Sequence, residues 1–188
     1  MSDDVEGQVR TDELDPERET RRQVALAQIR QYPDSVLHMQ AHPVEEFDDD
    51  LRRLVVRMKE LMKDANGVGL AATQVGVIRR LFVFAPDEER VLAVVNPALT
   101  RRDKATDVDD EGCLSIQGIS VPVERATAVR LEGRDENGKD VAYDLEGLAA
   151  RVVQHEYDHL DGTLILDRTT PEARREAMAA LRPRLVLR

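Results

Sequence analysis

The chain of 188 residues contains no tryptophan, only 3% aromatic residues and a single cysteine. One cysteine excludes an internal disulfide and is typical of a protein of the reducing cytosol. Scarce aromatic rings and a net charge of −10 argue against broad nucleic-acid binding. No apolar run is long enough to span a membrane, and the acidic start, Met1 to Glu6, lacks the apolar stretch of a secretory signal. We therefore expect a cytoplasmic protein without a membrane partner.

Hydrophobic residues make up 41% of the chain and charged residues 34%, which favours one globular domain with a real core. Residues 1–27 are polar and acidic for most of their length, and we expect them to form a flexible or loosely helical N-terminal extension without an assigned role. Residues 28–188 are then expected to form the single folded domain.

Helical and strand patterns alternate irregularly along this domain. Helical periodicity predicts helices at about 45–65, 145–160 and 171–181, and we expect the apolar stretch from Val24 to begin the fold. Short apolar runs and the turn Asn137-Gly138 predict strands at 81–85, 91–95, 128–132, 140–143 and 163–166. Asn96-Pro97 is expected to end the second strand. Strands clustered around one buried helix predict an α+β fold.

That buried helix carries His155 and Glu156, followed by His159. Residues four apart lie on one face of a helix, so both histidines can direct a ring nitrogen at one metal ion. The adjacent Glu156 can act as a general base toward a water molecule at the ion. A catalytic site usually has three protein ligands, and Cys113 is the outstanding candidate for the third. Taken alone, the pattern also fits two satisfied core histidines and an ordinary buried cysteine.

Two further segments change this balance. They are Gly67-Val68-Gly69-Leu70-Ala71-Ala72-Thr73-Gln74 and Glu111-Gly112-Cys113-Leu114-Ser115. With Gln154-His155-Glu156-Tyr157-Asp158-His159-Leu160-Asp161-Gly162, these segments resemble, in this order, the three signature motifs of peptide deformylase. The early Tyr32-Pro33-Asp34 also resembles that family, and the resemblance covers about residues 28–170.

The resemblance implies hydrolysis of the formyl group from the N-terminal formyl-methionine of newly made polypeptides, with release of formate. It also implies antiparallel or mixed sheets wrapped around a central metal-binding helix. One divalent ion is expected, Fe(II) foremost, with zinc, nickel or cobalt as alternatives that the sequence cannot distinguish.

The resemblance also assigns residues to roles. The metal ligands map onto Cys113, His155 and His159, and the general base onto Glu156. Gln74 and the backbone N–H of Leu114 map onto the pair that stabilises the oxyanion. Val68 and Gly69 are expected to hold the peptide backbone. Residues near the methionine pocket are expected to be Glu111, Gly112, Leu148 and Val152.

Three roles stay open in the sequence. Gln154 is interpreted as a packing residue or a partner of a ligand. Asp158 either orients a ligand histidine or faces solvent. The stretch 115–122 departs from the family, in which a proline is common at the place of Gln117 and a larger arginine or tyrosine near Ser120. Peptide preference beyond methionine is therefore not predicted.

Two rival functions can be compared with this one. A His-Glu-x-x-His protease usually finds its third ligand after the motif, where this chain offers only the acidic residues Asp161, Asp167, Glu172 and Glu176. A non-enzymatic metal-binding or ribosome-binding module would need neither Glu156 nor Gln74. The sequence therefore supports both alternative functions less well than the deformylase hypothesis.

The C-terminal segment has a local excess of positive charge. Six arginines (Arg168, Arg174, Arg175, Arg182, Arg184, Arg188) stand against three acids (Asp167, Glu172, Glu176), a net of +3 (6 − 3). Because the substrates are nascent chains, this segment can contact the ribosome, although a solvated helix face explains the same pattern.

Overall fold

The computed structural model describes residues 5–6, 9–10 and 15–186, with side chains from 15 to 182. Its helices are α1 (Pro16–Leu26), α2 (Asp49–Asp64), α3 (Gly147–Leu160), α4 (Ile165–Arg168) and α5 (Pro171–Val186), with 3-10 turns at Ser35–His38 and Ala72–Val75. The strands are β1 (Val5–Glu6), β2 (Val9–Arg10), β3 (Gly69–Ala71), β4 (Leu81–Phe84), β5 (Leu92–Arg102), β6 (Thr106–Gly112), β7 (Ser120–Ala126), β8 (Ala128–Arg134) and β9 (Asp140–Glu146).

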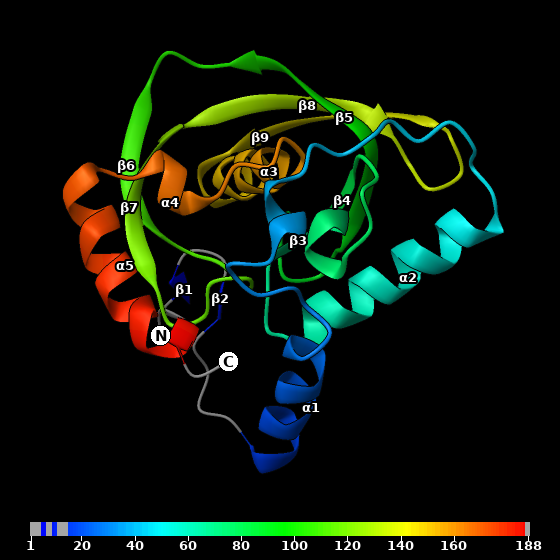
Figure 1. Ribbon diagram of the computed structural model, residues 1–188. Helices are drawn as coiled ribbons and strands as arrows, with labels where there is room; N and C mark the ends of the chain where they lie inside the picture. Colours follow the sequence, from blue (N-terminus) through cyan, green and yellow to red (C-terminus); the bar gives the residue numbers. More distant parts are fainter. Residues whose placement is uncertain (1–4, 7–8, 11–14, 187–188) are drawn as a thin grey trace.

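The strands form antiparallel sheets around α3. The largest sheet has the order β3-β4-β5-β8-β9, β6 pairs with β7 in a separate hairpin, and β1 pairs with β2. Figure 1 shows α3 enclosed by the five-stranded sheet and the β6–β7 hairpin, with α5 outside the hairpin and α2 on the opposite side of the molecule. The fold is α+β, as predicted.

The position of α3 follows from its composition. Apolar residues such as Val152, Val153 and Leu160 pack with the inner side chains of the five-stranded sheet, among them Phe82 and Leu131. Nearly every side chain of the helix from Ala150 onward is buried. A helix that is buried on all sides lies inside the protein, so polar groups on it must find partners there. This places the two histidines in the interior.

Helix α2 forms the wall of a second core. Asp48 caps it by accepting a hydrogen bond from the Leu51 N–H (2.9 Å), and the acidic residues Asp49 and Asp50 occupy the positive end of the helix dipole. Its buried stripe packs against β3, β4 and β5; the buried residues are Leu51, Val55, Met58, Leu61 and Met62. The predicted range of about 45–65 is therefore correct apart from its first turn.

Helix α1 lies within the range expected to be a flexible extension. Asp15 caps it, and its last residues Ala25 and Leu26 are buried in the core that α2 also lines. Residues 16–26 are thus helical, with a packed C-terminal end, because the apolar residues near that end find a surface on α2. Residues 1–4, 7–8 and 11–14 lie outside the described residues, and the domain boundary at residue 27 stays a prediction.

Two local predictions were wrong. Asn96-Pro97 does not end its strand, because a register shift between Val95 and Ala98 accommodates the proline and β5 continues to Arg102. The segment 163–166 is not a strand; α4 begins at Ile165, where the Asp167 carboxylate accepts a hydrogen bond from the Leu164 N–H (2.9 Å). The hairpin around Asn137-Gly138 is confirmed, and Gly138 has a positive φ of 82° in its turn.

Candidate metal centre

Three potential ligand atoms converge where α3 meets the segment after β6. His155 and His159 stand one turn apart on α3, and their Nε2 atoms lie 3.1 Å from each other. The Sγ atom of Cys113 lies 3.3 Å from Nε2 of His159, and all three donor atoms lie within 4.8 Å of one another. All three side chains are buried. A thiolate and two imidazoles are a donor set that suits zinc and the later divalent transition metals.

The close spacing of the three donor atoms fits a single metal ion held by a thiolate and two imidazoles. His155 donates its Nδ1–H to Glu111 (3.0 Å), which leaves the lone pair of its Nε2 facing His159 and Cys113. Burial raises the pKa of the Cys113 thiol to about 12. Burial, together with the nearby His155, holds the pKa of His159 well below its usual value. The lowered pKa favours a neutral His159 imidazole, whose Nε2 lone pair can bind a cation, and a bound cation would take the place of the thiol proton of Cys113.

Glu156 lies beside the three donors without belonging to them. Its side chain is fully buried, and among the described residues neither carboxylate oxygen has a hydrogen-bond partner. Burial, and next the charge of Glu111, raise the pKa of Glu156 well above its usual value. An isolated buried carboxyl with a raised pKa is suited to accept a proton during a reaction.

Strand β3 and the turn after it form the wall opposite Glu156. An ideal Cβ atom on Gly69 would overlap the Oε1 atom of Glu156, so the absence of a side chain at position 69 is required for the close approach. Gln74 accepts a hydrogen bond from the Ala71 N–H at Oε1 (2.8 Å), which fixes the orientation of the amide. Its Nε2 atom then donates to Ser115 Oγ (3.1 Å) and lies 3.7 Å from Cys113 Sγ.

The remaining residues predicted for substrate binding differ in exposure and in their positions along β6 and α3. Val68 and Val152 are buried, and Gly112 is the last residue of β6, directly before Cys113. Leu148 is 47% exposed, in the first turn of α3. Gln117 lines a cleft of about 820 Å³ together with Gln23 of α1 and Gln28 just after it, so the atypical loop faces the end of the N-terminal helix.

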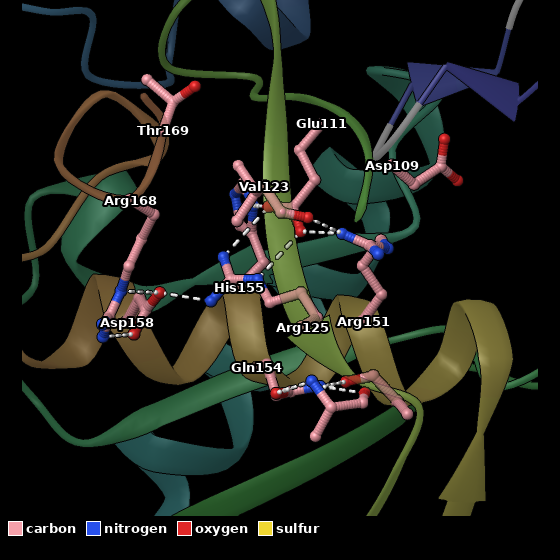
Figure 2. A network of polar contacts seen from close by, with 12 residues as sticks. Asp109, Glu111, Val123, Arg125, Arg151, Gln154, His155, Asp158, Arg168 and Thr169 are labelled. Carbon is pink, nitrogen blue, oxygen red and sulfur yellow. Dashed lines mark hydrogen bonds and ion pairs between the residues drawn. The ribbon is translucent and has the colours of Figure 1, made fainter. Parts of the chain in front are cut away.

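Glu111 has contacts that the sequence did not predict. Its Oε2 atom accepts the hydrogen bond of His155, and Arg125 and Arg151 both donate to its carboxylate (2.9–3.0 Å). Burial alone would raise the pKa of Glu111, but the hydrogen bonds from His155 and Arg125 outweigh it and hold the pKa far below its usual value. Figure 2 shows Glu111 between these three donors. Glu111 therefore stays ionised and fixes the tautomer of His155.

Asp158 has neither of the two roles that the sequence left open. Instead of contacting a ligand histidine or facing solvent, it is buried and forms ion pairs with Arg125 and Arg168 (both 2.6 Å). Gln154 is a packing residue, as one of its interpretations proposed. Its amide bonds the backbone of Ala126 on β7 in both directions (3.1 and 2.9 Å), which joins α3 to the hairpin.

Comparison with known proteins decides the family. The model of the polypeptide deformylase family matches residues 26–175. The chain belongs to this family. A peptide deformylase of Thermotoga sp. (strain RQ2) is 46% identical over 149 residues, which cover 79% of this chain and 90% of that protein.

Solved deformylase structures agree with the sequence comparison. The crystal structure of the Thermotoga maritima peptide deformylase matches with a TM-score of 0.74 at 45% identity, covering 76% of this chain and 97% of that chain. The Legionella pneumophila peptide deformylase matches with a TM-score of 0.79 at 38% identity, covering 85% and 95%. Membership of the deformylase family makes this chain a hydrolase that removes the N-terminal formyl group from newly made peptides. No helix in the described part of the chain combines the length and apolar character that crossing a membrane requires.

Proposed function

We propose that Cys113, His155 and His159 hold one divalent metal ion and that Glu156 is the general base of formyl-methionyl peptide hydrolysis. The observation that carries this proposal is the convergence of three buried donor atoms beside a buried carboxylate that has no partner of its own. A structural metal site would need four closed ligands and no such carboxylate. The proposed location is the cytoplasm, where nascent chains emerge.

The side chains divide the reaction between them. A divalent ion held by Cys113, His155 and His159 would supply Lewis acidity for the formyl carbonyl and for a water molecule. Glu156 takes a proton from the attacking water and delivers it to the leaving amine. Gln74 Nε2 and the backbone N–H of Leu114 stabilise the charge that develops on the formyl oxygen. Removing one donor of this kind typically costs on the order of 2.7–4 kcal/mol.

Substrate contacts complete the proposal. Val68 and Gly69 present the backbone of the β3 region to the peptide, and Gly112, Leu148 and Val152 border the methionine side chain. The carboxylate of Glu111 is already occupied by His155 and two arginines. We therefore propose that this carboxylate orients His155. Only the other atoms of Glu111 would then border the methionine pocket.

Formate release from a formyl-Met tripeptide, with metal content measured on anaerobically prepared protein, tests this function. We expect about one ion per chain and formate release that a chelator abolishes. Cleavage of internal peptide bonds in place of formate release would favour a protease instead.

For the ion itself we propose Fe(II), with zinc, nickel and cobalt as alternatives that the same donors accept. The iron form should lose activity in air or peroxide, and the nickel form should lose it several-fold more slowly, because the thiolate–iron pair is oxidisable. Cys113 itself is buried, so the oxidant must enter the protein interior to reach it. Activity followed over time in air checks this expectation, and equal decay of the two forms would contradict it.

For the C-terminal segment we propose an electrostatic contact with ribosomal RNA that weakens with salt. Internal ion pairs occupy three of its arginines: Arg168 binds Asp158, Arg174 binds Asp167 and Arg175 binds Glu172. The contact would therefore depend on Arg182 and the arginines that follow it. Deletion of residues 182–188 should reduce co-sedimentation with ribosomes and leave hydrolysis of short formyl peptides intact. Unchanged co-sedimentation would leave the segment a structural role only.

A further inference from the structure

Six side chains of alternating charge form a continuous ion-pair network beside the proposed metal centre. Each member contacts the next through hydrogen bonds or ion pairs of 2.6–3.0 Å. The members, in order, are Asp107, Arg151, Glu111, Arg125, Asp158 and Arg168. The four inner residues are buried, and the two end side chains are 58% and 46% exposed. Three acids and three arginines balance to zero, which makes the buried charges tolerable.

Within this network, Arg151 contacts Glu111 from the same helix that carries His155. It precedes His155 by four residues on α3, so the two side chains lie on one face of the helix. Glu111, on β6, faces both. Its Oε1 atom accepts from Arg151 Nη1 (2.9 Å), and its Oε2 atom accepts from His155 Nδ1 (3.0 Å). Figure 2 shows Arg151 and His155 reaching Glu111 from the same helix.

Arg151 is itself held from outside the helix. Its Nη1 also donates to the backbone oxygen of Val123 on β7 (2.8 Å), and its Nη2 donates to the carboxylate of Asp107 on β6 (2.7 Å). The planar guanidinium therefore joins α3 to both strands of the hairpin. Arg125 also donates to both oxygens of Glu111, through Nε (2.9 Å) and Nη2 (3.0 Å), but it extends from β7, so Arg151 is the arginine that reaches Glu111 from the helix that carries His155.

We propose that Arg151 is a positioning residue for the metal ligand His155. By fixing one oxygen of Glu111, it keeps the other aligned with the Nδ1–H of the imidazole, and Asp107 holds Arg151 in place. The proposal rests on the metal site assigned above. Arg151 lies outside the groups that contact the ion or the peptide, so it acts only through Glu111.

The test uses the nickel-loaded enzyme and measures metal loss to a chelator, the visible spectrum of the cobalt form, and thermal unfolding. Loss of a group that orients a ligand typically costs about 10–100-fold in metal affinity or activity. Arg151→Met should therefore release nickel about 10–100-fold faster than the parent and shift the cobalt spectrum. Arg151→Lys should recover part of this loss. Asp107→Asn, which loosens only the outer anchor, should have a smaller effect in the same direction.

Arg130→Met is the matched control, because it breaks ion pairs with Asp144 and Glu132 on the exposed face of β8. It should leave nickel release and the cobalt spectrum unchanged. If Arg151→Met does not fold, Arg151→Lys and Asp107→Asn provide the test of the role of Arg151. Release at the parent rate in both of these variants, with an unshifted cobalt spectrum, would overturn the role of Arg151. Absence of metal from the parent chain would instead overturn the proposed metal site.

Discussion

Replacing Glu156 by alanine should abolish nearly all deformylation and leave the metal content unchanged. Glu156 lies beside the three donor atoms but is not one of them, and its carboxylate has no hydrogen-bond partner in the described part of the chain. A positioned general base contributes typically about 10²–10⁴-fold to rate, so kcat should fall by that order. Stability should not fall, because the change removes a buried carboxylate that no partner compensates. Formate release, metal analysis and thermal unfolding measure the three quantities.

The neighbouring Tyr157 supplies a control for this experiment. Its ring packs under the guanidinium of Arg80, on the side of α3 away from the donors, and Tyr157→Phe keeps the ring. This variant should retain both metal and activity. Metal loss in Glu156→Ala would make Glu156 a ligand, and near-normal turnover would remove it from the reaction.

Replacing Cys113 by serine should remove most of the bound metal and, with it, the activity. Serine has nearly the same size, so the buried site after β6 keeps its packing, but a neutral hydroxyl is a far weaker ligand than a thiolate for later transition metals. The loss of affinity should exceed the roughly 10–100-fold that removal of a group beyond the ligands costs. Metal analysis after gel filtration and titration with a competing chelator measure it.

The two variants separate ligand from base. Glu156→Ala should hold metal without turnover, whereas Cys113→Ser should hold neither metal nor turnover while unfolding at a temperature close to that of the metal-free parent. A serine variant that retains one ion per chain would show that the Cys113 thiolate is not required as a ligand.

Periodic segments were predictable because their signal is local. Helix α2 carries its own cap and a continuous buried stripe, and the β8–β9 hairpin carries Asn137-Gly138 in its turn. The strands β6 and β7 gave no such signal. Most of β6 is acidic and exposed, and only its pairing with β7 makes it a strand. The position and contacts of residues such as Arg125 on β7 could therefore not be predicted from the sequence.

The same distinction separates the two halves of the proposed metal centre. The helical repeat links His155 and His159, so the sequence alone brings the two histidines to one face of α3, with Glu156 next to the first of them. That Cys113 lies 3.3 Å from His159, and that Gln74 points its amide at the same place, depends on how β3 and the β6–β7 hairpin pack around the helix.

The sequence by itself determined which chemistry the chain offers: a thiol, two imidazoles one helical turn apart, and a carboxylate beside the first of them. Tertiary structure alone decided how these groups are held. Glu111 accepts a hydrogen bond from His155, and Asp158 forms ion pairs with Arg125 and Arg168. Buried charged groups need partners of opposite charge or hydrogen-bond donors, and the fold decides which of these lie within reach. Glu111 and Arg125 come from the β6–β7 hairpin, far from α3 in sequence, and Arg168 lies beyond the end of α3, so no helical or strand periodicity predicts these contacts.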